Sequence, residues 1–261
     1  MSLPQDDLPP GYRKTALVTG ASKGIGAATA LAFAKEGYDV CVNYSSDRRG
    51  ADETVAACRD AGVRAIAVGA DVADQQAVRA MFDTCDELLG PVTCLVNNAG
   101  IIGGTSTLPD LAQEALRRTF EANLFGTVYC LQEAVKRMRT DQGGAGGAIV
   151  NMSSLAATLG SPGEYVHYAA SKAAVETLTI GAGKELGPLG IRVNAIRVGT
   201  TATSMHEREG NPDRPRMVAE ATPMGRIAQP QDIADAVVWL ASPRSGFVSG
   251  TILTVAGGLA P

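Results

Sequence analysis

The sequence has few of the residues that mark disulfide scaffolds and metal centres. Only five of its 261 residues are cysteine and two are histidine. The cysteines stand at positions 41, 58, 85, 94 and 130 with no C-x-x-C spacing and no secretory leader before them, and His167 and His206 lie far apart. A disulfide framework and a zinc site therefore lack a plausible set of residues. We expect buried, reduced thiols in a cytoplasmic protein without a metal.

Long apolar runs and an excess of basic charge are also missing. Runs such as 236–241 are far shorter than the roughly 20 residues of a membrane-spanning helix. The 23 basic and 27 acidic side chains give a net charge of −4, and no lysine- or arginine-rich tract is present. We therefore expect neither a membrane nor a nucleic acid as a partner. Because 45% of the residues are hydrophobic, the chain can bury a core and we expect a soluble globular protein.

Short β-branched runs alternate along the chain with longer amphipathic segments. Residues 1–12 hold three prolines among polar residues and are predicted to be a flexible tail, and 13–261 are predicted to be one domain. Strands are predicted at 15–19, 39–43, 64–68, 93–97, 148–152, 192–196 and 251–255. Helices are predicted at 24–36, 50–61, 74–90, 110–140, 165–187 and 230–241.

This alternation predicts an α/β fold, a doubly wound, seven-stranded parallel sheet with helices on both faces. The segment at about 200–228 interrupts the rhythm. It holds Pro212, Pro215 and Pro223 among charged residues and has no strand pattern. Because long irregular insertions beside the carboxyl ends of strands are often functional, we expect it to be a loop over the substrate.

A glycine-rich turn follows the first predicted strand and precedes the first predicted helix. It reads Thr19-Gly-Ala-Ser-Lys-Gly-Ile-Gly26, with the spacing GxxxGxG in place of GxGxxG. Glycines at such a turn let the backbone approach a pyrophosphate, which free amides and the helix dipole then stabilise. A tight turn without a ligand is the alternative interpretation of this motif taken alone.

Four further motifs fall at or just after the ends of predicted strands, where open parallel sheets bind ligands. They are Asp71-Val72, Asn97-Asn-Ala-Gly100, Ser153-Ser154 and Tyr168-Ala-Ala-Ser-Lys172.

Tyr168 and Lys172 are four residues apart and so share one face of a helix. We expect the ammonium to lower the phenol pKa, because a nearby positive charge favours the phenolate. A lowering of about 3 pH units would require roughly 4 kcal/mol of interaction energy, which is plausible for a partly desolvated pair. The competing Tyr165 has Ala169 at the same spacing and gains no such charge.

Together these motifs make the sequence resemble the short-chain dehydrogenase/reductase family from Lys14 to Gly258. The resemblance implies a Rossmann-type catalytic domain in which Tyr168 is the general acid and base. It implies that Lys172 assists the tyrosine and that Ser154, in preference to Ser153, hydrogen-bonds the substrate oxygen. Asn123, within the predicted fourth helix, corresponds to the asparagine that anchors a proton-relay water.

The resemblance also implies a set of cofactor contacts. After the predicted strand at 192–196, the family's usual Pro-Gly is replaced by Val198-Gly199. The correspondence of Thr201 and Thr203 to family positions is therefore less exact. The contacts implied are Gly20, Ser22, Lys23, Gly24, Ile25 and Gly26 for the phosphates, Asp71 and Val72 for adenine, Asn97, Ala99 and Gly100 for ribose, and Tyr168, Lys172, Gly199, Thr201 and Thr203 near the nicotinamide.

The end of the second predicted strand bears on cofactor choice, because NAD enzymes place a carboxylate there against the ribose hydroxyls. Asn43 stands at this position, Ser45 and Ser46 can donate to a 2′-phosphate, and Lys23 with Arg48 or Arg49 can neutralise it. We predict NADP(H), with NAD(H) as the alternative that nearby Asp47 favours.

The sequence thus predicts an NADP(H)-dependent oxidoreductase that interconverts a carbonyl and a secondary alcohol. The family resemblance implies a homotetramer built through the fourth and fifth helices and the last strand. The alternatives are an NAD(H)-preferring sugar or polyol dehydrogenase of the same family, a dinucleotide-binding regulator without turnover, and a methyltransferase. The regulator would not need Tyr168 and Lys172, and the methyltransferase has no use for them. Sugars, polyols, 3-oxoacyl thioesters, steroids and xenobiotic ketones all stay open as substrates.

Overall fold

The computed structural model describes residues 13–203 and 214–259. Seven parallel strands form one sheet in the order β3-β2-β1-β4-β5-β6-β7, so the predicted fold class is confirmed. The chain crosses back over the sheet between β3 and β4, and this reversal puts the switch point between β1 and β4. The strands are β1 (Thr15–Val18), β2 (Asp39–Tyr44), β3 (Ala65–Gly69), β4 (Cys94–Asn97), β5 (Gly147–Ser154), β6 (Ile191–Val198) and β7 (Ile252–Val255).

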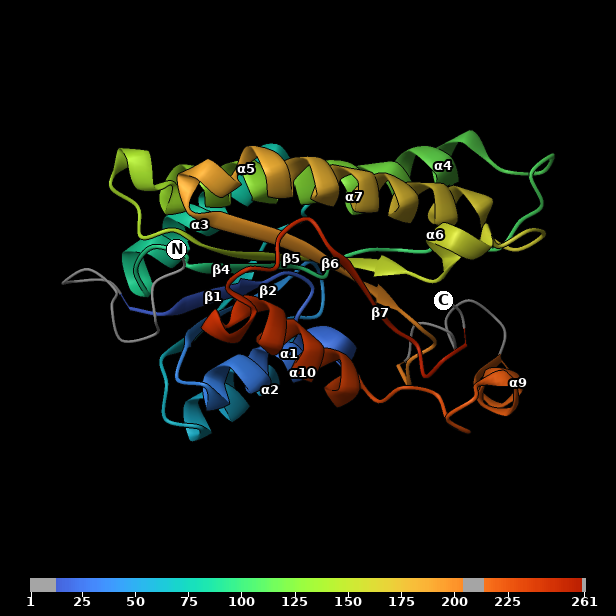
Figure 1. Ribbon diagram of the computed structural model, residues 1–261, viewed down its shortest axis with the longest axis horizontal. Coiled ribbons are helices and arrows are strands. Elements are labelled where there is room, and N and C mark those ends of the chain that lie inside the picture. The colour runs from blue at the N-terminus through green and yellow to red at the C-terminus, as the bar shows by residue number, and fades with distance from the viewer. Residues whose placement is uncertain (1–12, 204–213, 260–261) are drawn as a thin grey trace.

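Helices cover both faces of the sheet (Figure 1). On one face lie α3 (Gln75–Leu88), α4 (Gln113–Phe120), α5 (Gly126–Met138) and α7 (Val166–Glu185). On the other lie α1 (Gly24–Lys35), α2 (Arg48–Asp60) and α10 (Pro230–Ala241). Two shorter helices, α6 (Ala156–Leu159) and α9 (Arg214–Ala221), lie at the end of the sheet where β5 and β6 finish.

The core has one apolar cluster on each side of the sheet, because successive side chains of a strand point to opposite faces. In β1, Ala16 and Val18 belong to the cluster under α1, α2 and α10, whereas Leu17 belongs to the cluster under α3, α5 and α7. Strands buried on both faces are therefore apolar at nearly every position. This is why each predicted strand was visible as a continuous hydrophobic run.

The helix predicted at 110–140 is not a single α-helix. It begins at Gln113 and contains a π-helical turn, η1 (Glu121–Phe125), between α4 and α5. The sequence pattern predicts neither α6 nor α9. It also does not predict the short 3-10 turns η2 (Thr140–Gln142), η3 (Gly187–Leu189) and η4 (Pro243–Ser245). The predicted tail and residues 204–213 of the predicted substrate loop lie outside the described residues.

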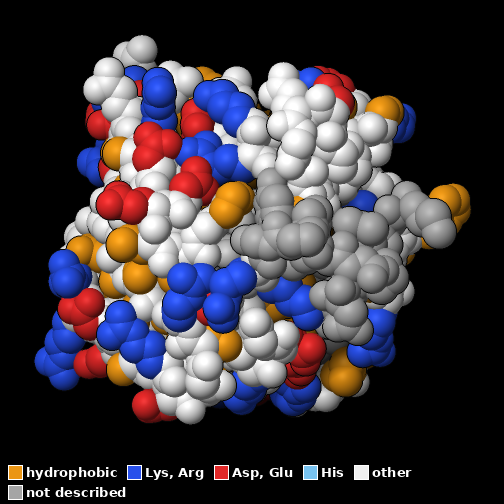
Figure 2. Space-filling view, turned by 90° about the vertical axis from the view of Figure 1, so that its left-hand side faces the viewer, with side chains coloured by type: hydrophobic (Ala, Val, Ile, Leu, Met, Phe, Trp, Pro, Cys, Tyr) orange, Lys and Arg blue, Asp and Glu red, His pale blue; other side chains and the backbone are white. Residues whose placement is uncertain are grey.

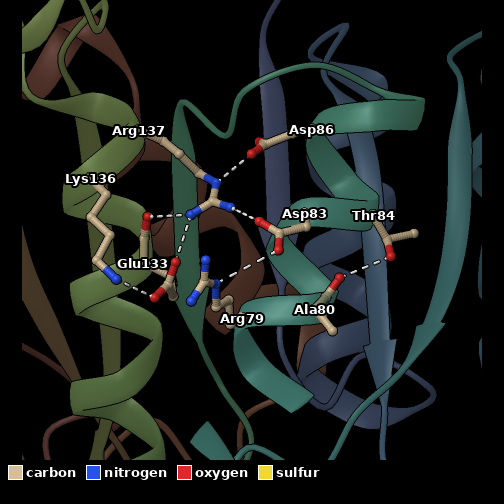
Figure 3. A network of polar contacts seen from close by, with 8 residues as sticks. All are labelled: Arg79, Ala80, Asp83, Thr84, Asp86, Glu133, Lys136 and Arg137. Carbon is tan, nitrogen blue, oxygen red and sulfur yellow. Dashed lines mark hydrogen bonds and ion pairs between the residues drawn. The ribbon is translucent and has the colours of Figure 1, made fainter. Parts of the chain in front are cut away.

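A network of ion pairs joins α3 to α5 around Arg137 (Figure 3). Its guanidinium contacts Asp83, Asp86 and Glu133, and only 12% of the Arg137 side chain is exposed. Burial raises the pKa of Asp86 against the effect of Arg137. Burial also opposes ionisation of Glu133, but hydrogen bonds from Lys136 and Arg137 outweigh it and lower the pKa of Glu133. The arginine thus compensates three carboxylates that would otherwise repel one another.

Basic and acidic side chains lie next to one another on the end of the molecule opposite α6 and α9 (Figure 2). Ion pairs one turn apart on a helix include Arg48 with Asp52 and Arg49 with Glu53, at the start of α2. Such exposed pairs contribute little to stability. Among the described residues, no helix is long and apolar enough to cross a bilayer.

Candidate active site

A cavity of about 270 Å³ opens where β4, β5 and β6 end. It is the place at which open parallel sheets bind ligands. Eight residues singled out from the sequence line it, and they come from the glycine turn, the strand ends and α7. They are Ile25, Gly100, Ser154, Tyr168, Lys172, Gly199, Thr201 and Thr203.

The glycine turn has the conformation that its spacing predicts. Gly20 and Gly24 have positive φ angles of 61° and 57°. Residues other than glycine adopt such angles only at an energetic cost. A Cβ at Gly26 would lie 2.5 Å from the Gly20 carbonyl oxygen, so the helix starts in direct contact with the turn. No side chain caps the amino end of α1. Its free amides therefore form a site suited to an anion.

Thr203 reaches this turn from the far side of the cavity. A Cβ at Gly24 would lie 3.2 Å from the Thr203 methyl carbon. Ser22 is half-buried in the turn. Thr201 is buried, donates to the Gly199 carbonyl at 3.0 Å and bridges to Ala228, so its hydroxyl serves the turn after β6. The structure therefore gives Thr203 and Thr201 different surroundings, although both line the cavity.

The cations expected around a 2′-phosphate lie at the surface and are already paired. Lys23 contacts Asp47 at 3.1 Å, with 42% of the lysine side chain exposed. Arg48 and Arg49 pair with acidic residues of their own helix. Ser45 is exposed. Since exposed ion pairs are weak, these cations can exchange partners when a phosphate approaches.

The side chain of Asn43 is bonded to other parts of the protein. It is buried, and its amide oxygen accepts from the Gly20 backbone at 3.2 Å. Its amide nitrogen donates to the carbonyls of Val68 and Ala70. The side chain thus joins β2 and β3 to the glycine turn. The cofactor contact at Asn43 stays a prediction.

The neighbouring residues Asn97 and Asn98 have different surroundings. Asn97 is buried and donates to the side chain of Asn151, which donates in turn to Thr179 on α7. Asn98 is the residue that lines the cavity, and it donates to the carbonyls of Thr19 and Gly20. Strand alternation could have separated these two neighbours, because only one of them can face the ligand side.

Three other predicted contacts lie along the same edge of the sheet. The Asp71 side chain is exposed and accepts from the Ala73 backbone. Val72 is buried against Gly126, where a Cβ would approach its methyl group to 2.8 Å. Ala99 packs under the glycine turn, since a Cβ at Gly20 would lie 2.9 Å from its Cα.

Tyr168 and Ser154 both line the cavity. Burial raises the pKa of Tyr168 to about 12, and the neighbouring Ser154 hydroxyl offsets part of this effect. The direction of this pKa is thus opposite to the lowering expected from Lys172, because burial is the largest effect on it. The Lys172 Nζ lies 5.8 Å from the centre of the Tyr168 ring.

Lys172 is only 5% exposed, and its Nζ donates to the Met152 carbonyl at 2.8 Å. Burial lowers its pKa to about 8. A Cβ at Gly100 would lie 3.4 Å from Lys172 Nζ and 2.9 Å from Asn123 Oδ1. Only a glycine lets the backbone after β4 pass between these two groups.

Asn123 lies in the π-helical turn, a departure from α geometry that often occurs at functional sites. Its amide binds both backbone groups of Ile101, accepting from the nitrogen at 2.8 Å and donating to the oxygen at 2.9 Å. It also donates to Ser171 on α7. The side chain thus ties the loop after β4 to the helix that carries Tyr168 and Lys172.

The two neighbouring serines have different partners. The Ser153 hydroxyl donates to Glu176 at 2.8 Å, and Glu176 is paired with Arg197 of β6. Ser154 contacts Tyr168 and accepts from the Ala156 backbone. Tyr165, the competing tyrosine, packs edge-on against Tyr168 at 5.7 Å between ring centres. This arrangement favours Ser154 and Tyr168 as the reactive pair.

The remaining residues of the cavity wall are mainly apolar. They come from the ends of β5 and β6, from the segments after β4, β5, β6 and β7, from α6 and from α9. They include Ile102, Met152, Leu155, Ala156, Leu159, Ser161, Val198, Thr200, Val218 and Leu259. In the described part of the chain, no cluster of three histidine, cysteine or acidic residues could hold a metal.

The sequence matches known oxidoreductases over almost its whole length. The family model described as enoyl-(acyl carrier protein) reductase matches residues 20–260. The uncharacterized oxidoreductase YgfF of Escherichia coli is 47% identical over 93% of this chain and 98% of that protein. An L-rhamnose 1-dehydrogenase (NAD(P)(+)) from a Sphingomonas species is 40% identical over 94% and 96%. A 3-oxoacyl-[acyl-carrier-protein] reductase from Staphylococcus aureus is 37% identical over 94% and 98%.

The fold gives the same result. A crystal structure of a protein from Agrobacterium tumefaciens, provisionally named a gluconate dehydrogenase, superposes with a TM-score of 0.87 at 32% identity. The match covers 98% of each chain. With its glycine turn, its tyrosine and lysine on one helix and these relatives, the chain belongs to the short-chain dehydrogenase/reductase family, the enzymes that oxidise CH–OH groups or reduce carbonyls.

Proposed function

We propose that this protein is an NADP(H)-dependent oxidoreductase that interconverts a carbonyl and a secondary alcohol. One observation carries the proposal: Ser154, Tyr168 and Lys172 line a single cavity that also reaches the glycine turn. Hydroxyl groups at a reacting oxygen and an anion site for a dinucleotide are the two parts that this reaction needs.

The residues present fit a nicotinamide dinucleotide. The uncapped amides of α1 suit a pyrophosphate. Side chains at Gly20 and Gly26 would collide with Ala99 and with the backbone of the turn, so these glycines keep the turn tight against the start of α1. When bound, this group supplies the hydride in reduction and accepts it in oxidation. Gly100 and Lys172 line the same cavity on the side of the reacting atoms.

Tyr168 donates a proton to the substrate oxygen in reduction and accepts one in oxidation. With its pKa at about 12, the phenol is protonated at neutral pH and is ready for the reductive direction. Ser154 donates a hydrogen bond to the same oxygen as negative charge develops there. Lys172 supplies a positive charge beneath the tyrosine, and Asn123 positions α7 through Ile101 and Ser171.

The preference for NADP(H) rests on the surface near the glycine turn. Lys23 faces the end of β2, where the buried residue is a neutral asparagine. A 2′-phosphate would draw Lys23 away from Asp47, whereas ribose hydroxyls would leave the ion pair intact. The NAD(H) alternative keeps its support from Asp47 and from the relative named for both NAD and NADP.

We also infer a cytoplasmic homotetramer. All five cysteines are unpaired and buried, as in a reduced compartment. Phe125 on the α4–α5 layer is 46% exposed and Ile180 on α7 is 40% exposed, and β7 forms an edge of the sheet. Apolar side chains on these faces suit contacts between subunits. Light scattering coupled to size-exclusion chromatography tests this, and a monomer at micromolar concentration would contradict it.

The reaction is tested by following the oxidation of NADPH and of NADH with a panel of ketones, ketoses and 3-oxoacyl thioesters. We expect turnover with at least one carbonyl class and a higher kcat/KM for NADPH. A higher kcat/KM for NADH would support the alternative cofactor. Tight NADPH binding without turnover on any carbonyl would support the regulator and contradict the enzyme.

A further inference from the structure

The substrate end of the cavity is mainly apolar. Ile102, Leu155, Leu159, Val218 and Leu259 form much of its wall. Leu159 projects from α6 with 58% of its surface exposed, so it lies at the rim where a ligand enters. Exposed leucine at a cavity rim is a feature of sites that take apolar ligands.

Charge is scarce in this wall. Among the described lining residues, Lys172 is the only one with a charged side chain. Its ammonium is already bonded to the Met152 carbonyl and lies next to Tyr168. A carboxylate or phosphate on the substrate would therefore find no cation besides Lys172 among the described residues of this wall.

Ser161 is the exception in this wall. Its φ angle is 46°, and it is the only residue other than glycine in the described chain with a positive φ. Gly160 and Gly163 beside it have φ angles of 74°. A left-handed serine costs about 1 kcal/mol or more, which a glycine would avoid, and such strain is often found at functional sites.

The backbone around Ser161 holds it in place. Its carbonyl oxygen accepts from the backbone nitrogens of Glu164 and Tyr165, at 3.3 and 3.2 Å. The residue is 9% exposed and lines the cavity, yet no hydrogen bond from its hydroxyl to the described residues is found. A ligand that displaces water from this cavity must pair that hydroxyl or leave it unsatisfied.

We propose that the substrate is an uncharged, mainly apolar ketone or secondary alcohol that carries a second neutral hydrogen-bonding group, and that Ser161 binds this group. The inference rests on the proposed oxidoreductase function and specifies its substrate class. Ser161 is then a specificity residue, because a substrate that covers its hydroxyl without pairing it binds less favourably than one that carries the second group.

The test compares ketones that differ by one hydroxyl. The probes are 4-phenylbutan-2-one and its three ring-hydroxylated isomers, with acetoacetate as the charged carbonyl and D-fructose as the polyol. Each is assayed with NADPH on the wild type, Ser161→Ala, Ser161→Gly and Thr158→Ala. Thr158 is the matched control, since it is exposed on α6, bonds only to Leu155 and does not line the cavity.

We expect the best hydroxylated isomer to have a kcat/KM about tenfold above that of the parent ketone in the wild type. This ratio should fall close to one in both Ser161 variants, through KM, and stay unchanged in Thr158→Ala. Ser161→Gly should keep the wild-type Tm, because relief of the left-handed conformation offsets the greater freedom of glycine in the unfolded chain. An unchanged ratio in Ser161→Ala, or a kcat/KM for acetoacetate or D-fructose above that of every aryl ketone, would overturn the inference.

A binding measurement separates this inference from the proposed reaction. Calorimetry with the NADPH complex of Tyr168→Phe measures recognition without proton transfer. Tighter binding of a hydroxylated isomer, lost in the double variant with Ser161→Ala, supports the role of Ser161 even when the wild type turns over none of the probes. Turnover of the wild type combined with equal binding of parent and hydroxylated ketones refutes the role of Ser161 and leaves the reaction in place.

Discussion

Replacing Lys172 by methionine should stabilise the protein while it removes activity. The amine is 5% exposed, and burial lowers its pKa from 10.5 to about 8. A pKa lower by about 2.5 corresponds to a penalty of roughly 3 kcal/mol on the charged form in the folded state. Methionine removes this penalty but leaves the Met152 carbonyl without its donor, which costs about 1–2 kcal/mol. We expect a net gain of about 1–2 kcal/mol in the free energy of unfolding at pH 7.

The pH dependence of this gain identifies its cause. Because the folded-state pKa of Lys172 lies below the unfolded-state value, the penalty is fully present below pH 8 and disappears as the pH rises towards 10.5. Urea unfolding at pH 7 and at pH 9.5, at one protein concentration, should show a stabilisation that shrinks at the higher pH. Lys184→Met on the exposed side of the same helix is the control, and it should change neither value by more than about 0.5 kcal/mol. A Lys172→Met variant that is less stable than the wild type at pH 7, or a gain independent of pH, would refute the reasoning.

The remaining predictions concern the reaction, the cofactor and the core. The kcat/KM for NADPH-dependent reduction should decline above pH 8 as Lys172 loses its charge, and a flat profile to pH 10 would argue against its role. Lys23→Ala should lower the kcat/KM for NADPH about tenfold and that for NADH by less than threefold, whereas equal losses would remove the argument for a 2′-phosphate contact. Arg137→Met should lower the free energy of unfolding by about 2–4 kcal/mol at pH 7, because it removes the cation that Asp83, Asp86 and Glu133 share. Because the folded-state pKa of Glu133 is lowered, the part of this loss that comes from Glu133 should diminish as the pH falls through the ordinary range of carboxyl pKa values. Urea unfolding at pH 7 and in mild acid measures the loss, and a loss below about 0.5 kcal/mol at pH 7 would contradict the compensating role of the arginine.

The sheet could be predicted because its strands are buried on both faces and stand out as apolar runs. The helices that were missed lack such a pattern. The four residues of α6 are too few to show a periodicity, and α9 starts among prolines and charges in a segment that reads as a loop. The π-helical turn at Asn123 inserts one extra residue per turn without any signal in composition.

The sequence predicts those site residues whose role depends on backbone geometry. It does not predict the residues whose role depends on the direction in which a side chain points. Gly20, Gly24 and Gly26 are required by a turn that the sequence places between a strand and a helix. Asn43 and Asn97 stand at strand ends, as expected, but point inward, because packing chooses which of two alternating faces is buried. The pKa of Tyr168 depends on burial, which opposes the charge effect that helix spacing suggests.

The strained serine was also beyond sequence reasoning. Pro162 and the flanking glycines indicate a turn near Ser161, but the left-handed φ of the serine depends on how that turn closes against the start of α7. Its open hydroxyl becomes visible only when the cavity is assembled from segments far apart in the chain.

The central claim is that Tyr168 transfers the proton while the cofactor site functions independently of it. The most direct test is the single-turnover rate of carbonyl reduction by Tyr168→Phe with bound NADPH, measured beside the dissociation constant of NADPH. We predict a rate at least about 1,000-fold lower than that of the wild type, with a dissociation constant within about threefold. A variant that keeps more than a tenth of the wild-type rate would contradict the account.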